Sequence, residues 1–240
     1  MYFLSFETST KIFSLAVNKD EKVLRYRNLN AASVLEDSIL PAMDKILDAA
    51  GIKFREIDGF AIALGPGSFT SLRVGLATIK AFAMSTGKPV VGIPSLDIIA
   101  QGIKNAVKAF DPYDEICVIN DARRGKVYTC LYGPNGSSDH LLTSLDEILE
   151  KVHGKTLFVG DALKIYRHDI QEAYRKYTHR KNSTGKCLFA DEKWWYPHAG
   201  VMAALAYERF RQKQYDNAAS LSPLYLYPQD CQVSQVKNGR

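Results

Sequence analysis

The sequence predicts an α/β protein built from two lobes, and three observations support this fold class. The chain opens with apolar, β-rich runs, it continues with alternating helical and strand segments, and this alternation occurs twice along the 240 residues. A chain of this length can form two small lobes that share a core. We expect a first lobe in residues 1–105, a second in residues 106–230 and a frayed tail in residues 231–240.

The first lobe is expected to begin with a three-stranded antiparallel sheet. Residues 2–6 and 12–17 are apolar runs joined by short polar residues, which suits a hairpin turn, and residues 22–27 supply a third strand. A helix over residues 33–50 follows, because apolar side chains recur there with helical spacing. Those side chains include Leu35, Ile39, Met43, Ile46 and Leu47.

A strand, a glycine-rich turn and a helix form the most specific part of this lobe. Residues 58–64 are apolar without alternation, as expected of a strand buried on both faces. The turn Gly65-Pro66-Gly67 ends this strand, and a helix over Thr70–Ser85 follows. A strand at 90–93 and a helix at 95–109 complete the lobe. The apolar positions of the Thr70–Ser85 helix are Leu72, Leu76, Ile79, Phe82 and Ala83.

The second lobe repeats this order. Two strands flank the polar residues 121–125, and helices alternate with strands after them. Residues 182–193 are polar and irregular, which predicts a surface insertion. The expected strands are 115–120, 126–132, 156–159 and 223–227, and the expected helices are 144–152, 162–177 and 199–214.

The excess positive charge, a formal net +5, comes from one segment. Residues 164–186 hold seven Lys and Arg residues but only two acids. Tyr166, Tyr174 and Tyr177 lie between these basic residues, so one interpretation is contact with the phosphates and bases of RNA. The other interpretation is a solvated helix and loop.

Cysteine and histidine spacing does not indicate a metal site. The four cysteines form no CxxC pair, and the five histidines form neither HxxxH nor HExxH. We therefore expect reduced thiols and no bound metal in a cytoplasmic protein. The apolar runs are too short to span a membrane, and the first residues lack the positive segment of a signal peptide.

Two interpretations remain open for the turn Gly65-Pro66-Gly67. Glycines between a buried strand and a helix can aim backbone amides at an anion, or they can permit a tight turn and close packing. The turn lacks the Gly-Lys-Ser/Thr of a Walker A loop and does not match GxGxxG, and no GxSxG motif occurs in the chain. Candidate polar residues near strand ends are Glu7, Thr8, Ser9, Asp121 and Asp161, each of which can equally be a turn or cap residue.

Several motifs together resemble the bacterial TsaB (YeaZ) family. The run IALGPGSFTSLRVGLATIKAFA covers Ile62–Ala83. The opening LSFETST resembles the family's N-terminal hairpin, which usually carries Asp at the position of Glu7. Further matches, which extend the resemblance from residue 4 to residue 226, are Gly92–Leu96, Asp121-Ala122-Arg123, Tyr128, Val159-Gly160-Asp161 and Pro223–Leu226.

This resemblance implies a two-lobed actin-like (ASKHA, ribonuclease H-like) fold. It also implies a place in the machinery that installs threonylcarbamoyladenosine next to the tRNA anticodon. In that system the paralogue TsaD performs the transfer at a metal-supported site, TsaB binds TsaD through its first lobe, and the ATPase TsaE joins the pair. The resemblance therefore implies a non-catalytic activator that binds no cofactor tightly, meets tRNA through the complex and can form a homodimer when isolated. ATP would be used by the assembled complex.

The helix over residues 33–50 bears on catalysis and on partner binding. TsaD-type proteins carry metal-binding histidines on the corresponding helix, and this helix has none, so neither a TsaD-like transferase nor a metallopeptidase-like activity is expected. The resemblance implies that this helix and the Thr70–Ser85 helix form the contact with TsaD, unless the same residues face the chain's own sheet. The implied contact residues are Leu35, Ile39, Met43, Leu72, Arg73, Leu76 and Ile79.

An enzyme is the second functional hypothesis. An ATP-dependent kinase or phosphotransferase of the actin-like class would use Glu7, the Gly65–Gly67 turn and Asp121. The accessory-subunit hypothesis leaves Glu7, Thr8, Ser9, Gly65, Gly67 and Asp121 as a vestigial nucleotide site.

Overall fold

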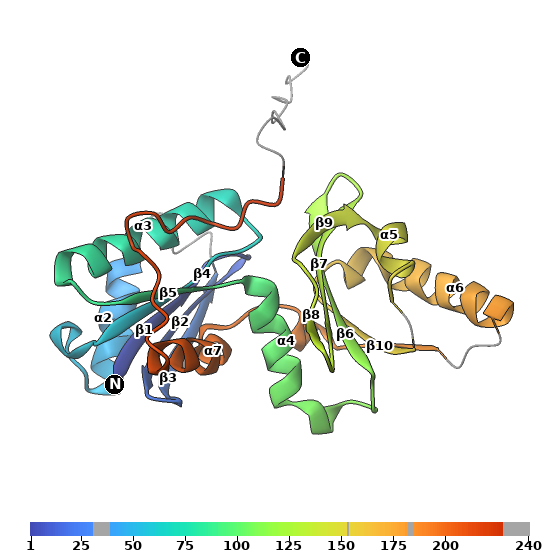
Figure 1. Cartoon of the computed structure of the whole chain (residues 1–240). Helices are drawn as coiled ribbons and strands as arrows, with labels where there is room; N and C mark the ends of the chain where they lie inside the picture. The colour runs from blue at the N-terminus through green and yellow to red at the C-terminus, as the bar shows by residue number, and fades with distance from the viewer. Residues whose placement is uncertain (31–38, 153, 182–184, 228–240) are drawn as a thin grey trace, which may run out of the picture.

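Two mixed β-sheets, each covered by helices, organise the chain (Figure 1). A computed structural model describes residues 1–30, 39–152, 154–181 and 185–227. Within those ranges, none of the helices has the length and apolar character needed to cross a membrane.

The first sheet has the strand order β3-β2-β1-β4-β5. Its first three strands form an antiparallel meander, and β4 and β5 run parallel to β1. All of β4 is buried, as its unbroken apolar run predicts. The strands are β1 (Tyr2–Glu7), β2 (Ile12–Lys19), β3 (Lys22–Asn30), β4 (Gly59–Ala63) and β5 (Val90–Ile93).

Helices α2 (Ile39–Ala50) and α3 (Phe69–Thr86) cover one face of this sheet (Figure 1). Their apolar sides join a core with alternate side chains of β1 and β2, which is the amphipathic arrangement that the sequence predicts. Helix α3 starts after Ser68 and ends at Gly87, whose φ of 67° is the left-handed conformation of a helix stop.

Helix α7 (Ala199–Arg211) covers the opposite face of the first sheet. Met202, Ala206 and Phe210 pack there against Phe3 and other residues of β1, β2, β4 and β5. A sheet with two apolar faces needs a cover on both sides, so the chain must return to the first sheet after building the second.

The second sheet has the strand order β11-β10-β6-β7-β8, and β9 also pairs with β7. Helix α4 (Ser95–Asn105) leaves the first sheet after β5 and packs Leu96, Ile99 and Ile103 into the core of the second. Helices α5 (Leu145–Leu149) and α6 (Leu163–Lys181) complete this lobe. The strands are β6 (Glu115–Arg123), β7 (Lys126–Gly133), β8 (Gly136–Ser137), β9 (Leu141–Ser144), β10 (Lys155–Val159) and β11 (Lys186–Phe189).

Three short 3₁₀ turns complete the element list of the described residues. They are η1 (Phe54–Glu56), η2 (Val107–Ala109) and η3 (Glu192–Trp194). The second of them ends the helical stretch that the sequence predicts over residues 95–109.

The predicted division into residues 1–105 and 106–230 needs a correction. Helix α4 belongs to the first segment but contributes most of its apolar side to the second core, and α7 belongs to the second segment but packs on the first sheet. Sequence periodicity identifies an apolar helix face but does not say which sheet that face covers. The tail in residues 231–240 lies outside the described residues.

Two predicted elements near the C-terminus are also wrong. Residues 182–193 were expected to be irregular, but Lys186–Phe189 form β11, which pairs in parallel with β10. Residues 223–227 were expected to form a strand, but they have no regular structure. A four-residue edge strand carries too little periodicity to be recognised, and the apolar run near Leu224 instead packs along the first lobe.

Residues 216–227, which we call the C-terminal strap, run along α3 and then reach the second lobe (Figure 1). Asp216 pairs with Val90 of β5 and with the guanidinium of Arg209 at 3.0 Å. Lys80 of α3 donates hydrogen bonds to two carbonyls of the strap at 2.9 and 3.0 Å. At its end, the Tyr227 hydroxyl donates to the Ala122 carbonyl at 2.7 Å.

Candidate functional site

The hairpin between β1 and β2 carries a fully buried carboxyl group. Glu7 is 0% exposed and lies opposite Ser14 in the strand register. One oxygen of its carboxyl group accepts a hydrogen bond from the Ser9 amide at 2.7 Å, and the other has no hydrogen-bond partner in the described part of the chain. The hairpin therefore folds around its own acidic side chain.

Burial raises the pKa of Glu7 from 4.5 to about 7, and the hydrogen bond from the Ser9 amide offsets only part of this effect. The hydroxyl groups of Thr8, Ser9 and Ser95 are buried and have no hydrogen-bond partner among the described residues, so small polar atoms gather around the end of β1. Burial thus favours the neutral form of this carboxyl group, and a negatively charged phosphate beside it would raise its pKa further.

The turn Gly65-Pro66-Gly67 packs directly on this hairpin. A Cβ atom at Gly67 would lie 2.1 Å from the Ser9 carbonyl oxygen, and the Ser68 amide donates to that same oxygen at 2.7 Å. On α3, a Cβ atom at Gly75 would lie 2.4 Å from the Thr8 hydroxyl oxygen. Gly67 and Gly75 thus permit close contact between backbone and hairpin, which is the packing interpretation of the glycine turn.

Asp121 lies in the second lobe and does not join the cluster around Glu7. Its carboxylate accepts from the Arg123 amide at 2.8 Å and pairs with the Arg123 guanidinium at 3.2 Å. Asp161 accepts a hydrogen bond from the Asp121 amide, and burial raises the pKa of Asp161. The structure therefore brings five of the six vestigial-site residues together and leaves Asp121 in a separate, second-lobe acid pair.

One contact links the first hairpin to the linker before α7. The Lys11 ammonium group lies 4.7 Å from the centre of the Tyr196 ring. Nearby, the Ala199 amide at the start of α7 donates to the Ser14 hydroxyl at 3.0 Å. The buried hairpin thus also contacts the start of α7 and the residues before it.

Most of the predicted partner-binding residues lie in the chain's own core. Ile39 and Met43 of α2 are 8% and 6% exposed. Leu72, Leu76 and Ile79 of α3 are 2%, 6% and 0% exposed; Leu76 and Ile79 join the core of the first lobe, and Leu72 lies beside Gly65. Their burial leaves these five side chains little surface for a partner, because the strongest helical periodicity marks the face that covers the sheet. Leu35 lies outside the described residues.

The outer surface of α2 and α3 carries apolar side chains that the sequence prediction missed. Leu40 is 53%, Phe69 53% and Met84 63% exposed. Exposed Ala77 and Ala81 lie between Phe69 and Met84 on α3. We call these five residues the outer face. The sequence did contain a signal for this surface. Positions 69, 73, 77 and 81 are four residues apart, which places their side chains in a row along the helix, on a different side from the buried residues.

Arg73 is the one predicted partner-binding residue on this outer surface. Its guanidinium group lies 3.8 Å from the centre of the Phe69 ring, and its Nε atom donates to the Tyr225 hydroxyl at 3.0 Å. The two rings lie 5.6 Å apart, so the strap helps to hold Arg73. A guanidinium group fixed between aromatic rings loses little side-chain entropy when a partner binds.

The basic segment keeps its charges at the surface but turns its described tyrosines inward. Lys164, Arg167, Arg175 and Lys176 are exposed on α6. Tyr174 is 7% exposed and bonds the Thr156 hydroxyl at 2.8 Å, and Tyr166 packs against the same core. The interpretation in which the tyrosines of this segment contact RNA bases therefore does not hold for Tyr174, because its ring fills the second core. The side chains of residues 177–181 lie outside the described set.

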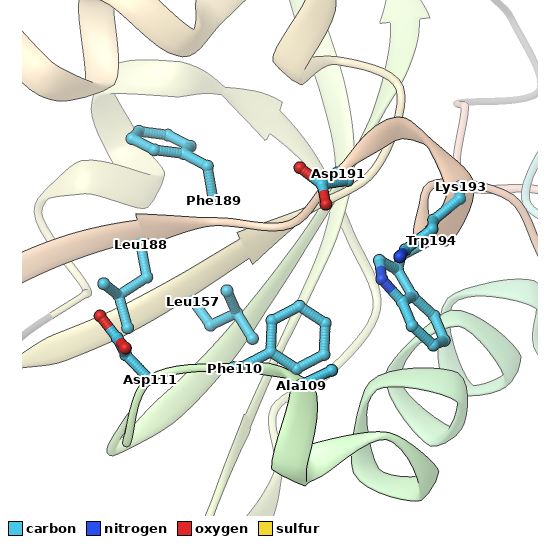
Figure 2. Close-up of a pocket in the computed structure, with 9 residues that line it drawn as sticks. All are labelled: Ala109, Phe110, Asp111, Leu157, Leu188, Phe189, Asp191, Lys193 and Trp194. Carbon is cyan, nitrogen blue, oxygen red and sulfur yellow. The ribbon is translucent and has the colours of Figure 1, made fainter.

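A pocket of about 280 Å³ opens at the edge of the second sheet (Figure 2). Phe110 and Trp194 form one wall, with ring centres 5.7 Å apart, and Leu157 and Leu188 also line the pocket. The pocket has carboxylates at Asp111 and Asp191 and an ammonium group at Lys193. This excess of acid does not suit a phosphate group.

Comparisons with known sequences point to one family. The family model described as "TsaD: tRNA N6-adenosine threonylcarbamoyltransferase" matches residues 30–225. The "tRNA threonylcarbamoyladenosine biosynthesis protein TsaB" of Buchnera aphidicola subsp. Schizaphis graminum is 30% identical over 67% of this chain and 79% of its own. The protein of the same name from Haemophilus influenzae is 27% identical over 93% of this chain and 92% of its own.

Solved structures support the same fold. The crystal structure of a Pseudomonas aeruginosa protein described as similar to the peptidase YeaZ superposes with a TM-score of 0.72. It is 20% identical and covers 94% of this chain and 99% of its own. Two mixed sheets with helices on their faces, in the order described above, are the architecture of the actin-like fold.

Proposed function

We propose that this chain, which belongs to the TsaB (YeaZ) family of tRNA threonylcarbamoyladenosine biosynthesis, is a non-catalytic subunit that binds a TsaD-type transferase and activates it. The partner would dock on the outer face of α2 and α3, around Arg73. The observation that carries this proposal is the exposed apolar surface of that helical layer, with Arg73 held between Phe69 and Tyr225.

The composition of this surface supports a protein partner. Aromatic, Met and Arg side chains are enriched at the centres of protein interfaces, and the residues with the largest binding energies are often Trp, Tyr and Arg. Between Phe69 and Met84, α3 exposes the small side chains of Ala77 and Ala81, and small side chains would let a partner helix approach closely. A second copy of the chain could use the same surface when the partner is absent.

The rest of the assembly is part of the same proposal. We place TsaE and the tRNA at the complex with the TsaD-type partner, in the cytoplasm, and we assign the use of ATP to that complex. The buried carboxyl group of Glu7 supports this assignment, because it occupies the end of β1 where an anionic ligand would otherwise meet the hairpin. Calorimetric titration of the isolated chain with ATP and magnesium should show no tight binding, and micromolar binding would contradict the assignment.

Co-purification with the cognate TsaD-type protein tests the docking surface. Phe69→Asp and Ala77→Arg should abolish retention of the partner, because they place a charge or a long side chain at the centre of the contact. Ile165→Asp is the matched control, since Ile165 is 56% exposed on α6 in the other lobe. Retention by both outer-face variants, or loss in the control alone, would contradict the proposed surface.

A modification assay tests the activating role. Threonylcarbamoyladenosine formation by the partner, TsaE and tRNA should need this chain and should fail with Phe69→Asp. Full modification without this chain would contradict the activator role, even if the two proteins bind each other.

A further inference from the structure

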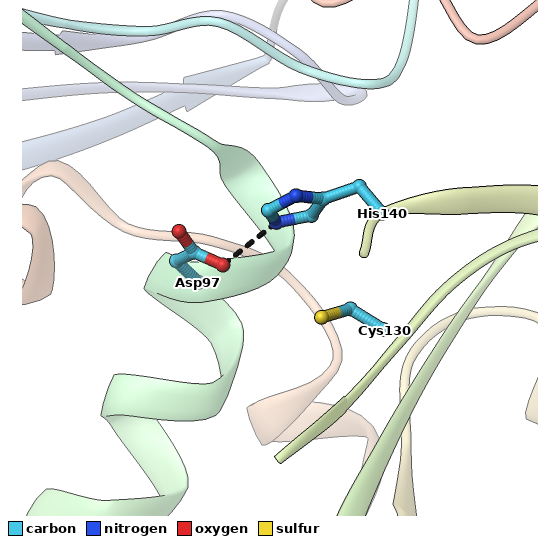
Figure 3. Close-up of side chains that lie close together, drawn as sticks. All are labelled: Asp97, Cys130 and His140. Carbon is cyan, nitrogen blue, oxygen red and sulfur yellow. Dashed lines mark hydrogen bonds and ion pairs between the residues drawn. The ribbon is translucent and has the colours of Figure 1, made fainter. Parts of the chain in front are cut away.

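Three side chains with metal-binding atoms converge where α4 meets the second sheet (Figure 3). Asp97 comes from the first turn of α4, Cys130 from β7 and His140 from the connection between β8 and β9. Their ligand atoms all lie within 4.8 Å of one another. Figure 3 shows the carboxylate, the thiol and the imidazole ring pointing toward a common point.

The surroundings orient these atoms. The Tyr132 hydroxyl donates to the Asp97 carboxylate at 2.6 Å, and His140 Nε2 lies 2.8 Å from the same oxygen. Cys130 is 0% exposed, and its thiol donates a hydrogen bond to the Ser138 carbonyl oxygen at 3.3 Å. A hydrogen bond from a neighbouring side chain, such as the one from Tyr132, commonly holds a metal-binding carboxylate in place.

Solvent reaches the cluster from one side. The side chains of Asp97 and His140 are 31% and 20% exposed. Asp97 also lines a pocket of about 390 Å³ between α4 and α7. An ion could therefore enter past the carboxylate and the imidazole ring and meet the buried sulfur last.

The donor set selects among metals. Thiolate and imidazole ligands favour zinc and its softer neighbours, whereas magnesium and calcium prefer oxygen atoms alone. Three protein ligands leave one position of a tetrahedral zinc ion for water. A plain hydrogen-bonded latch would account for Asp97, Tyr132 and His140, but it would not require a sulfur atom within 4.8 Å of the other two donors.

We propose that Asp97, Cys130 and His140 bind one zinc-like divalent ion, which fastens α4 to the second sheet. This proposal differs from the expectation of no metal site. That expectation rested on short sequence spacings, and these donors occupy positions 97, 130 and 140, which only the fold brings together. The site shares no residue with the outer face, so the metal-binding proposal can be tested independently of partner binding.

Cobalt(II) is the probe for the test, added to metal-free protein in a Cys187→Ser/Cys231→Ser background that removes two other thiols. One equivalent should produce a thiolate-to-cobalt charge-transfer band, and zinc should displace the cobalt. Cys130→Ala and His140→Gln should each abolish the band. Tyr132→Phe should keep the band but weaken cobalt binding by about tenfold, since it removes only an orienting hydrogen bond.

Matched controls separate the site from general effects of substitution. His168→Gln changes a histidine on α6 whose side chain is 82% exposed, and it should leave cobalt binding unchanged. Zinc should raise the melting temperature of the parent protein but not that of Cys130→Ala or His140→Gln. Absence of a band in the parent protein, or a band that persists in both ligand variants, would overturn the proposal. A His140→Gln variant that only loses stability, with no cobalt binding by the parent, would identify a hydrogen-bonded latch instead.

Discussion

Each lobe opens with a β-hairpin, and the two hairpins differ in what surrounds their tips. In the first, Thr8 and Ser9 are 0% and 1% exposed, and Gly67 and Gly75 press against them. In the second, Arg123 and Arg124 are exposed, and a Cβ atom at Gly125 would meet nothing within 4 Å. The same local element is thus part of the core in one lobe and a charged surface loop in the other.

The comparison shows that an acidic or glycine-rich strand end does not by itself make a ligand site. The first hairpin uses its carboxyl group to bind its own Ser9 amide, and the glycine turn fits against the hairpin backbone. The second hairpin holds Arg123, Arg124 and Gly125 at positive φ values of 65°, 55° and 72°. The first lobe therefore tolerates little change at its hairpin, and the second should tolerate much more.

Gly67→Ala should have the largest effect, because it places a methyl group 2.1 Å from the Ser9 carbonyl oxygen. Neither backbone can move without disturbing α3 or the first sheet, so we expect a loss of roughly 3 kcal/mol or more in the free energy of unfolding. Urea unfolding followed by circular dichroism measures it. Gly125→Ala is the matched control, and its open surroundings limit the cost to about 1–2 kcal/mol of left-handed backbone strain. Equal losses in the two variants would remove the contrast.

Glu7→Gln should have the next largest effect, and that effect should depend on pH. The folded pKa of about 7 lies above the ordinary value of 4.5, so between these values the folded state binds more protons than the unfolded state. The stability of the parent protein should therefore fall as pH rises from 4.5 through 7, by about 3 kcal/mol from this group. Glu7→Gln cannot ionise and should lack this component.

Unfolding curves at several pH values measure this difference between parent and variant. A matched Glu115→Gln variant changes a partly exposed carboxyl group of the second lobe and should leave the pH dependence in place. Parallel pH profiles for the parent protein and Glu7→Gln would show that the first hairpin is open to water.

Arg124→Gly should have the smallest effect and the opposite sign. Arg124 has a φ of 55°, a left-handed conformation that is strained for an L-residue and unstrained for glycine. Glycine also has more conformational freedom in the unfolded state, which offsets part of this gain. We expect a stabilisation of up to about 1 kcal/mol, measured by thermal unfolding. A clear destabilisation would mean that the guanidinium group makes a structural contact that the exposed tip does not suggest.

The sequence was sufficient for the elements that depend on local pattern. The hairpin at Glu7, the strand and turn before α3, and the limits of β5 were predicted because short-range periodicity and glycine positions determine them. The fold class followed from the same pattern, and the family resemblance added the actin-like arrangement.

Contacts between distant segments could not be predicted. The apolar stripe with Leu72 and Ile79 was the strongest helical signal, but a strong stripe marks the sheet-facing side, so the exposed stripe with Phe69 and Met84 was missed. The approach of Cys130 to His140 and Asp97 depends on how α4 crosses between the sheets. Tyr174 was misassigned because its position among basic residues says nothing about its direction.

The return of α7 to the first sheet has a consequence during synthesis of the chain. The strands of that sheet are complete once Ile93 has been made, but α7 begins only at Ala199. At a synthesis rate of about 5–20 residues per second, the sheet face with Phe3, Ala16 and Val91 stays uncovered for on the order of 10 seconds, until α7 has been made. The nascent first lobe therefore offers an apolar surface to chaperones on the ribosome, and a chain truncated before α7 should aggregate.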